Sequence, residues 1–153
     1  GCDPVIVVGR RDEACQRALD FGKATHVINN REQSVPNAVK KIMGGGGVSY
    51  AIEAIGDNGV LRDCLDSLAP GGKVGLYGVA PDSQGRSPLC DDPRVSKAGP
   101  IEAMVDEEVL RLVRQGIIPA REFVSHELGF TECAHAFELL ANRKAFKVGL
   151  KFT

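Results

Sequence analysis

Short apolar runs alternate with amphipathic segments along the first half of the chain. The first run, Val5–Val8, consists entirely of Val and Ile with no polar residue between them, which is typical of a strand buried on both faces of a parallel sheet. The following segment, Asp12–Phe21, has apolar residues at helical spacing and ends at Gly22, a common C-terminal residue of helices. A strand that ends in a polar turn and leads into a helix is one step of a doubly wound α/β fold.

The same alternation continues and predicts a parallel sheet connected by helices. Further strands are predicted at 26–29, 50–55, 73–79, 94–97 and 148–152, an extended segment at 123–126, and further helices at 35–43, 60–68, 109–113 and 131–140. The glycine run at 44–47 follows a helix and precedes a strand. It is therefore predicted to be a connector, because a dinucleotide-binding glycine loop follows a strand and leads into a helix. Pro70–Gly72 is predicted to be a tight turn before a strand.

The turn after the first strand suggests a ligand. Gly9, Arg10 and Arg11 follow the strand, and in doubly wound folds ligands bind beyond the carboxyl ends of the strands. An NAD site has an Asp or Glu here to accept the ribose hydroxyls, whereas a glycine followed by arginines offers guanidinium groups to a 2′-phosphate. A solvated basic turn is the alternative interpretation.

Composition narrows the class of protein. The chain has 153 residues, with 19 Lys and Arg against 20 Asp and Glu. This balance argues against a nucleic-acid-binding or membrane-surface protein, and no apolar run approaches the roughly 20 residues of a membrane span. The five cysteines are odd in number and widely spaced, which favours reduced thiols in a cytoplasmic protein. The start at Gly1 indicates a cut into a longer chain.

No residue in the chain is a convincing catalytic acid, base or metal ligand. The three histidines and the cysteines lack the spacing of zinc ligands. Glu53 comes just before the turn that follows the third strand, and it is expected to support that turn rather than to abstract a proton.

Taken together, the elements resemble the medium-chain, zinc-dependent alcohol dehydrogenases. The phrases that carry the resemblance are Ile52–Gly56, Leu68–Lys73 and Ala136–Leu140, and the similarity extends over nearly the whole chain. The resemblance implies a Rossmann-like, doubly wound parallel sheet in which hydride passes between an alcohol or polyol and NADP. It also implies a small-molecule substrate, a homo-oligomeric complete enzyme and a catalytic zinc.

The resemblance covers only the second half of such an enzyme. Members of the family have a first strand, a glycine-rich turn and the zinc ligands upstream of the part that this chain resembles. Residues 1–116 would form the NADP-binding domain, incomplete at its N-terminus, and residues 117–153 would return to the catalytic domain. In the strand order 3-2-1-4-5-6 the absent first strand lies in the middle. Val5–Val8 and Tyr50–Ile55 would then flank a gap, which we expect to be filled by another chain or to leave the fold marginally stable.

The resemblance also assigns roles to individual residues. Gly9, Arg10 and Arg11 would select NADP, Ala54, Ile55 and Gly56 would contact adenosine and ribose, Tyr77, Gly78 and Val79 would hold the nicotinamide carboxamide through main-chain groups, and Lys147 would lie near the pyrophosphate. Read without the family, the glycines are turn residues and Lys147 is a solvated flank.

Two other functions remain open from the sequence. A zinc-free quinone reductase of the same superfamily would share this half of the chain almost unchanged. An S-adenosylmethionine-dependent methyltransferase also has an α/β sheet and a Pro-Gly-Gly turn before a strand. Such an enzyme normally has an acidic residue at the strand end that Gly9 occupies.

Overall fold

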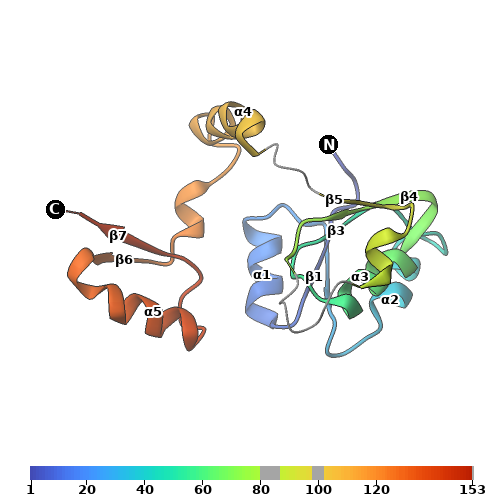
Figure 1. Ribbon diagram of the computed structural model, residues 1–153, viewed down its shortest axis with the longest axis horizontal. Coiled ribbons are helices and arrows are strands. Elements are labelled where there is room, and N and C mark those ends of the chain that lie inside the picture. Colours follow the sequence, from blue (N-terminus) through green and yellow to red (C-terminus); the bar gives the residue numbers. More distant parts are fainter. Residues whose placement is uncertain (80–86, 98–101, 153) are drawn as a thin grey trace. The chain divides into compact units, whose positions relative to one another are not determined.

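The computed structural model describes residues 1–79, 87–97 and 102–152. The chain divides into two compact units, Gly1–Ile101 and Glu102–Thr153 (Figure 1). The sequence placed a boundary at residue 116, between the cofactor-binding domain and the catalytic domain of a complete enzyme. That assignment is a different matter from the division into compact units, and it stays a prediction. No helix in the described part of the chain is long and apolar enough to cross a membrane.

The N-terminal unit alternates strands and helices, as predicted. Its elements are β1 (Ile6–Gly9), α1 (Asp12–Asp20), β2 (His26–Asn29), α2 (Val35–Ile42), β3 (Val48–Glu53), α3 (Asn58–Asp66), β4 (Leu68–Leu76), a 3₁₀ helix (Pro88–Asp91) and β5 (Val95–Lys97). Each strand pair is parallel. The predicted α/β fold with parallel pairing is therefore confirmed.

The sheet is divided in two. β1 pairs with β2, while β3, β4 and β5 form a second sheet in that order. Among the described strands, β1 and β3 are each hydrogen-bonded along one edge only. The division falls between β1 and β3, where the sequence predicted a missing central strand.

Apolar side chains are exposed along this division. Tyr50 and Ile52 of β3 are 75% and 73% exposed, and Val8 of β1 is 41% exposed. Large apolar side chains at alternate positions of a strand normally pack against a neighbouring layer. The strands that flank the division therefore carry the composition of a buried sheet without the cover that such a sheet needs.

Two clusters of buried residues hold the unit together. Ile28, Val35, Ala38 and Val39 form the first, and Leu61, Leu65 and Val74 form the second. Ile6 of β1 and Val48 of β3 both pack against the first cluster. Each fully buried aliphatic side chain contributes roughly 1.5–3 kcal/mol relative to exposure. Packing against α2 thus links the two sheets where backbone pairing between β1 and β3 is absent from the described structure.

The two glycine-containing connections differ in outcome. The run at 44–47 lies between α2 and β3 as predicted, with Gly44 and Gly45 at φ values of +64° and +100°. Pro70–Gly72, predicted as a tight turn before a strand, instead lies inside β4, so that prediction was wrong. The pairing of β3 with β4 shifts register at this segment, between Val48↔Leu68 and Tyr50↔Lys73, so β4 absorbs the extra residues as an irregularity within one strand.

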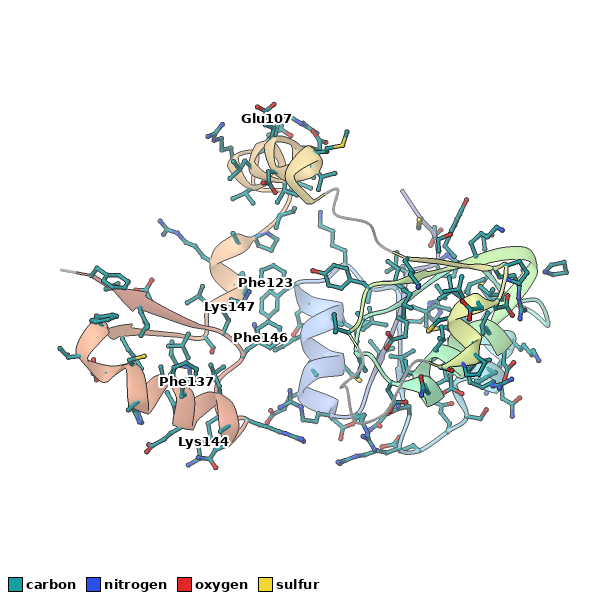
Figure 2. The ribbon with its side chains drawn as sticks, in the orientation of Figure 1. Glu107, Phe123, Phe137, Lys144, Phe146 and Lys147 are labelled. Carbon is teal, nitrogen blue, oxygen red and sulfur yellow. The ribbon has the colours of Figure 1, made fainter. Side chains whose placement is uncertain are left out.

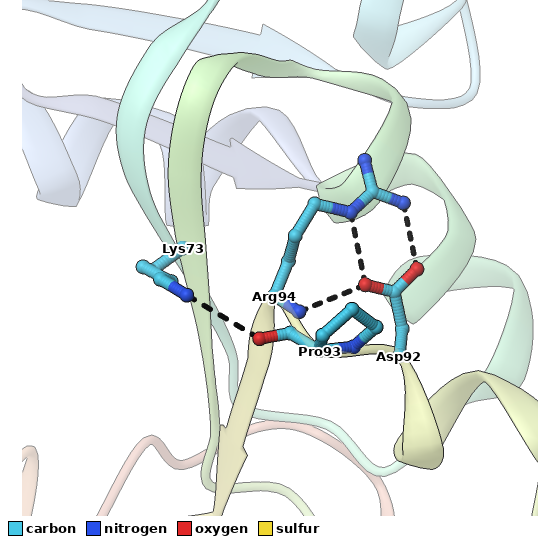
Figure 3. A network of polar contacts seen from close by, with 4 residues as sticks. All are labelled: Lys73, Asp92, Pro93 and Arg94. Carbon is cyan, nitrogen blue, oxygen red and sulfur yellow. Dashed lines mark hydrogen bonds and ion pairs between the residues drawn. The ribbon is translucent and has the colours of Figure 1, made fainter.

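The short strand β5 pairs with β4, and polar contacts fix the segment just before it, one of them to β4 and the others within the segment (Figure 3). Lys73 Nζ donates to the Pro93 carbonyl at 3.3 Å. The Arg94 guanidinium donates to both carboxylate oxygens of Asp92, at 2.9 and 2.7 Å. These hydrogen bonds from Arg94 lower the pKa of the Asp92 carboxyl to about 2. The predicted strand at 94–97 is confirmed, one residue shorter than expected.

The C-terminal unit contains α4 (Glu102–Arg114), a 3₁₀ helix (Ala120–Phe123), β6 (His126–Gly129), a second 3₁₀ helix (Phe130–Glu132), α5 (Cys133–Ala141) and β7 (Val148–Lys151), with β6 and β7 parallel. The extended segment predicted at 123–126 lies instead at 126–129. Phe123 ends a 3₁₀ helix, and its ring packs 6.4 Å from that of Phe146 (Figure 2). Phe123, which the sequence pattern assigned to an extended segment, thus takes part in ring packing instead.

The divided sheet predicts an uneven pattern of amide protection. In the isolated chain, amides of β4, which has neighbours on both sides, should exchange slowly. About half of the amides of β1 and β3 should exchange quickly, because alternate N–H groups of a strand point to opposite edges. Hydrogen exchange measured by NMR checks this, with sedimentation to establish that the sample is monomeric. Uniform strong protection of β1 and β3 in a monomer would show that the division is closed in solution.

Candidate cofactor site

The predicted site residues of the N-terminal unit follow three strands. Gly9 ends β1, residues 54–56 follow β3, and residues 77–79 follow β4. Because β3 and β4 are parallel neighbours, their carboxyl ends meet at one edge. The backbone N–H groups of Tyr77 and Gly78 both donate to the Glu53 carbonyl, at 2.8 and 2.9 Å. The second and third turns are therefore directly joined.

Glu53 lies at the centre of these two turns. Its side chain is 0% exposed. Oε1 accepts hydrogen bonds from the Ile55 and Gly56 N–H groups, both at 2.9 Å, and Oε2 accepts a second contact from Gly56 at 3.0 Å. Asp57 N–H also points to Oε1, at 3.5 Å. The supporting role expected for Glu53 agrees with these contacts, although the sequence did not reveal its complete burial.

Asp57 completes the same turn at the start of α3. Its Oδ1 accepts a hydrogen bond from the Val60 N–H at 3.0 Å and caps the helix. Two carboxylates thus engage the N–H groups of Ile55, Gly56 and Val60 and place negative charge beside the start of α3. The turn after β3 consequently suits a neutral part of a ligand better than a phosphate.

The two glycines of the joined turns are required by geometry. Gly56 has φ +85°, a left-handed conformation that favours glycine. A Cβ on Gly78 would collide with the Gly56 N–H nitrogen and would lie 2.5 Å from Glu53 Oε2. Both positions therefore require glycine for backbone reasons alone, which agrees with the turn-glycine reading that the sequence left open, and their contact with a cofactor stays a prediction.

Exposed apolar side chains surround the joined turns. Ile55, Tyr77 and Val79 are 65%, 60% and 86% exposed. They stand beside a buried and fully hydrogen-bonded carboxylate, so the turns combine a fixed backbone with an uncovered apolar surface. This combination is typical of a surface that a flat organic ligand or another protein segment covers.

The pKa of the Cys64 thiol, in α3, depends in part on the charge of Glu53. Burial, first of all, and then the negative charges of Glu53 and Asp63 together raise the pKa of the Cys64 thiol to about 11. The thiol is therefore protonated and unreactive near neutral pH.

The first turn provides the positive charge of the site. Arg10 and Arg11 are exposed, and neither guanidinium has a hydrogen-bond or ion-pair partner among the residues that the structure describes. A Cβ on Gly9 would lie 3.0 Å from the buried Cys15 Sγ. Packing of α1 against the strand end thus leaves little room for a side chain at residue 9.

Sequence reasoning missed the residue that organises the end of β2. Asn29 Nδ2 donates to Asp12 Oδ1 at 2.8 Å and to Glu32 Oε1 at 3.0 Å. Asn29 therefore ties the strand end to the first turn of α1, next in sequence to the arginines. The only available signal was a polar residue at a strand end.

Lys147 belongs to the C-terminal unit and immediately precedes β7. Its carbonyl accepts hydrogen bonds from the Ser125 N–H at 2.9 Å and from Ser125 Oγ at 3.1 Å. Its side chain is exposed (Figure 2). The contacts fix its backbone within that unit, and its proposed role at the pyrophosphate stays a prediction.

The described residues include no group of three or more His, Cys, Asp or Glu side chains that could hold a metal ion. The zinc implied by the resemblance therefore has no set of ligands in the described part of the chain.

The family comparison decides the relationship. The family described as zinc-binding dehydrogenase matches residues 1–96, which include β1 to β4 and every predicted site residue except Lys147. The chain belongs to the zinc-binding dehydrogenase family.

Individual relatives agree with this assignment. An L-threonine 3-dehydrogenase of Stenotrophomonas maltophilia is 27% identical, over 99% of this chain and 45% of the relative. A quinone oxidoreductase-like protein 2 of Rattus norvegicus is 38% identical, over 52% of this chain and 22% of the relative. The structure of an alcohol dehydrogenase from Thermus sp. ATN1 superposes with a TM-score of 0.84 at 25% identity, covering 99% of this chain and 45% of that one.

The chain thus spans about half the length of the threonine dehydrogenase and about half that of the Thermus alcohol dehydrogenase. The fold of this zinc-binding dehydrogenase chain is the Rossmann-like fold of such structures.

The contact of Gly78 with the Glu53 turn leads to a matched prediction. Gly78→Ala should lower the free energy of unfolding by about 1–3 kcal/mol, because the added methyl group collides with backbone that cannot move cheaply. Gly75→Ala is the control, since its Cβ would meet no atom closer than 3.9 Å. Urea denaturation of the two variants and the parent checks this. Equal stability of the two variants would contradict the close packing of the two turns.

Proposed function

We propose that this chain is the cofactor-binding half of an NADP-dependent alcohol or polyol dehydrogenase. Membership of the zinc-binding dehydrogenase family supports oxidoreductase chemistry. The observation that carries the cofactor assignment is the turn after β1, where Arg10 and Arg11 follow a glycine, are exposed and have no hydrogen-bond or ion-pair partner among the described residues. The rest of the catalytic machinery, including the zinc ligands, belongs to a larger protein.

In this proposal each of the three turns binds a different part of the cofactor. Arg10 and Arg11 bind the 2′-phosphate as charged hydrogen-bond donors. Residues 54–56 contact adenosine and ribose, a neutral region, which suits a turn in which a carboxylate already binds the N–H groups of Ile55 and Gly56. Main-chain groups of Tyr77, Gly78 and Val79 hold the nicotinamide carboxamide, and Lys147 approaches the pyrophosphate. The bound cofactor supplies hydride chemistry, and this chain's residues bind and orient it.

A zinc-free quinone reductase is the second candidate. The 38% identity to a quinone oxidoreductase-like protein, over about half of this chain, favours it. Both candidates use the same nucleotide-binding half, so they differ in the machinery outside it. The methyltransferase interpretation has no support from the family assignment. A homo-oligomeric complete enzyme remains part of the proposal.

The cofactor preference can be measured on the chain itself. Because Arg10 and Arg11 add charged hydrogen bonds to a 2′-phosphate, 2′,5′-ADP should bind at least about tenfold more tightly than 5′-AMP by calorimetry. Replacing both arginines with Ala should remove the difference, while Lys40→Ala, a basic residue on α2, should preserve it. Comparable binding of the two nucleotides by the parent chain would exclude the NADP assignment.

A variant designed to prefer 5′-AMP over 2′,5′-ADP must also make room at Cys15. Gly9→Asp supplies the carboxylate for a ribose hydroxyl but brings its Cβ to 3.0 Å from Cys15 Sγ. Combined with Cys15→Ala and neutral residues at 10 and 11, it should favour 5′-AMP over 2′,5′-ADP.

The second test concerns catalysis by this half alone. Because the described residues offer no zinc-binding group, the purified 153-residue chain supplied with zinc, NADP and a panel of primary, secondary and polyhydric alcohols should form no NADPH above the rate without protein. A full-length family dehydrogenase serves as the positive control. Turnover within about tenfold of a typical enzyme, on the order of 10 s⁻¹, would show that the chain contains its own catalytic site.

A further inference from the structure

Both turns after β3 and β4 converge on the Glu53 residue. Its side-chain carboxylate accepts N–H groups from the turn that follows β3, and its main-chain carbonyl accepts N–H groups from the turn that follows β4. Gly78 of the second turn lies so close that an added Cβ would approach Oε2 to 2.5 Å. One residue therefore sets the positions of both turns.

The chemistry of the acceptor matters as much as its position. The Gly56 N–H lies 2.9 Å from Oε1 and 3.0 Å from Oε2, so both oxygens face the same donor. A Gln in this place would present an NH₂ group to at least one backbone N–H, which places two donors against each other in a site that water does not reach. An Asp would be one methylene too short to reach the same amides.

We propose that Glu53 is a positioning residue for the cofactor, acting as a buried carboxylate that holds residues 54–57 and 77–79 in the shape that binds the nicotinamide nucleotide. This inference rests on the proposed function. Glu53 itself does not contact the ligand, because its side chain is 0% exposed, and it acts through the backbone amides that it binds. The negative charge also contributes to the raised pKa of the Cys64 thiol, which provides an independent readout of the carboxylate.

The test compares Glu53→Gln with Asp92→Asn in the 153-residue chain. Both substitutions convert a carboxylate of the N-terminal unit to an amide, and Asp92 bonds to Arg94 and not to either turn. Glu53→Gln should speed amide exchange at residues 55–57, 77 and 78 by roughly tenfold or more and weaken NADPH binding by a similar factor. Asp92→Asn should change neither, and Glu53→Asp should not restore binding.

The Cys64 titration separates loss of charge from loss of structure. Followed by the absorbance of the thiolate, its pKa should fall below about 11 in Glu53→Gln and stay unchanged in Asp92→Asn. Exchange and NADPH binding that match the parent in a folded Glu53→Gln variant would overturn the inference.

If Glu53→Gln does not fold, the parent chain still decides the question. NADPH should then slow exchange at residues 55–57, 77 and 78 more than at β5. Absence of that protection in a chain that binds NADPH overturns the positioning role and leaves the proposed function intact. A parent chain that binds no NADPH overturns both.

Discussion

The structure of the candidate site depends on one buried carboxylate that must be fully hydrogen-bonded. Glu53 has no access to solvent, and an unpaired buried carboxylate is costly. The requirement is met by the backbone of the following turn. That turn is thereby fixed, α3 begins at a defined point with Asp57 as its cap, and Gly78 packs against the same group. The positions of two loops thus follow from the satisfaction of one side chain.

A second constraint acts on the sheet as a whole. Parallel strands of this composition are normally covered on both faces and paired on both edges. Here the division between β1 and β3 leaves one edge of each strand unpaired in the described structure, with Tyr50 and Ile52 largely exposed. Packing of Ile6 and Val48 on the α2 cluster links the two parts. Unpaired strand edges are templates for association with further polypeptide.

The turns of the candidate site belong to two different sheets and differ in character. The turns after β3 and β4 are preorganised within one sheet by Glu53, whereas the turn after β1 belongs to the other sheet and carries two arginines without a partner among the described residues. A nucleotide bound as proposed would span both sheets. Almost the whole of this chain matches its relatives, but it covers only about half of their length. This agrees with the proposal that the catalytic site includes further residues.

The order and type of most elements follow from local signals in the sequence, namely the apolar periods of strands and helices and the breaks at Gly22 and 44–47. The sequence also predicted a cofactor role for Gly9, Arg10 and Arg11, and it predicted the place where the sheet divides. Other features became visible only in the folded chain: Pro70–Gly72 lies within β4, Phe123 packs on Phe146, and Asn29 joins β2 to α1. The folded chain alone showed Glu53 joining two turns. These features depend on contacts between residues distant in sequence or on burial, which no local pattern of residues encodes.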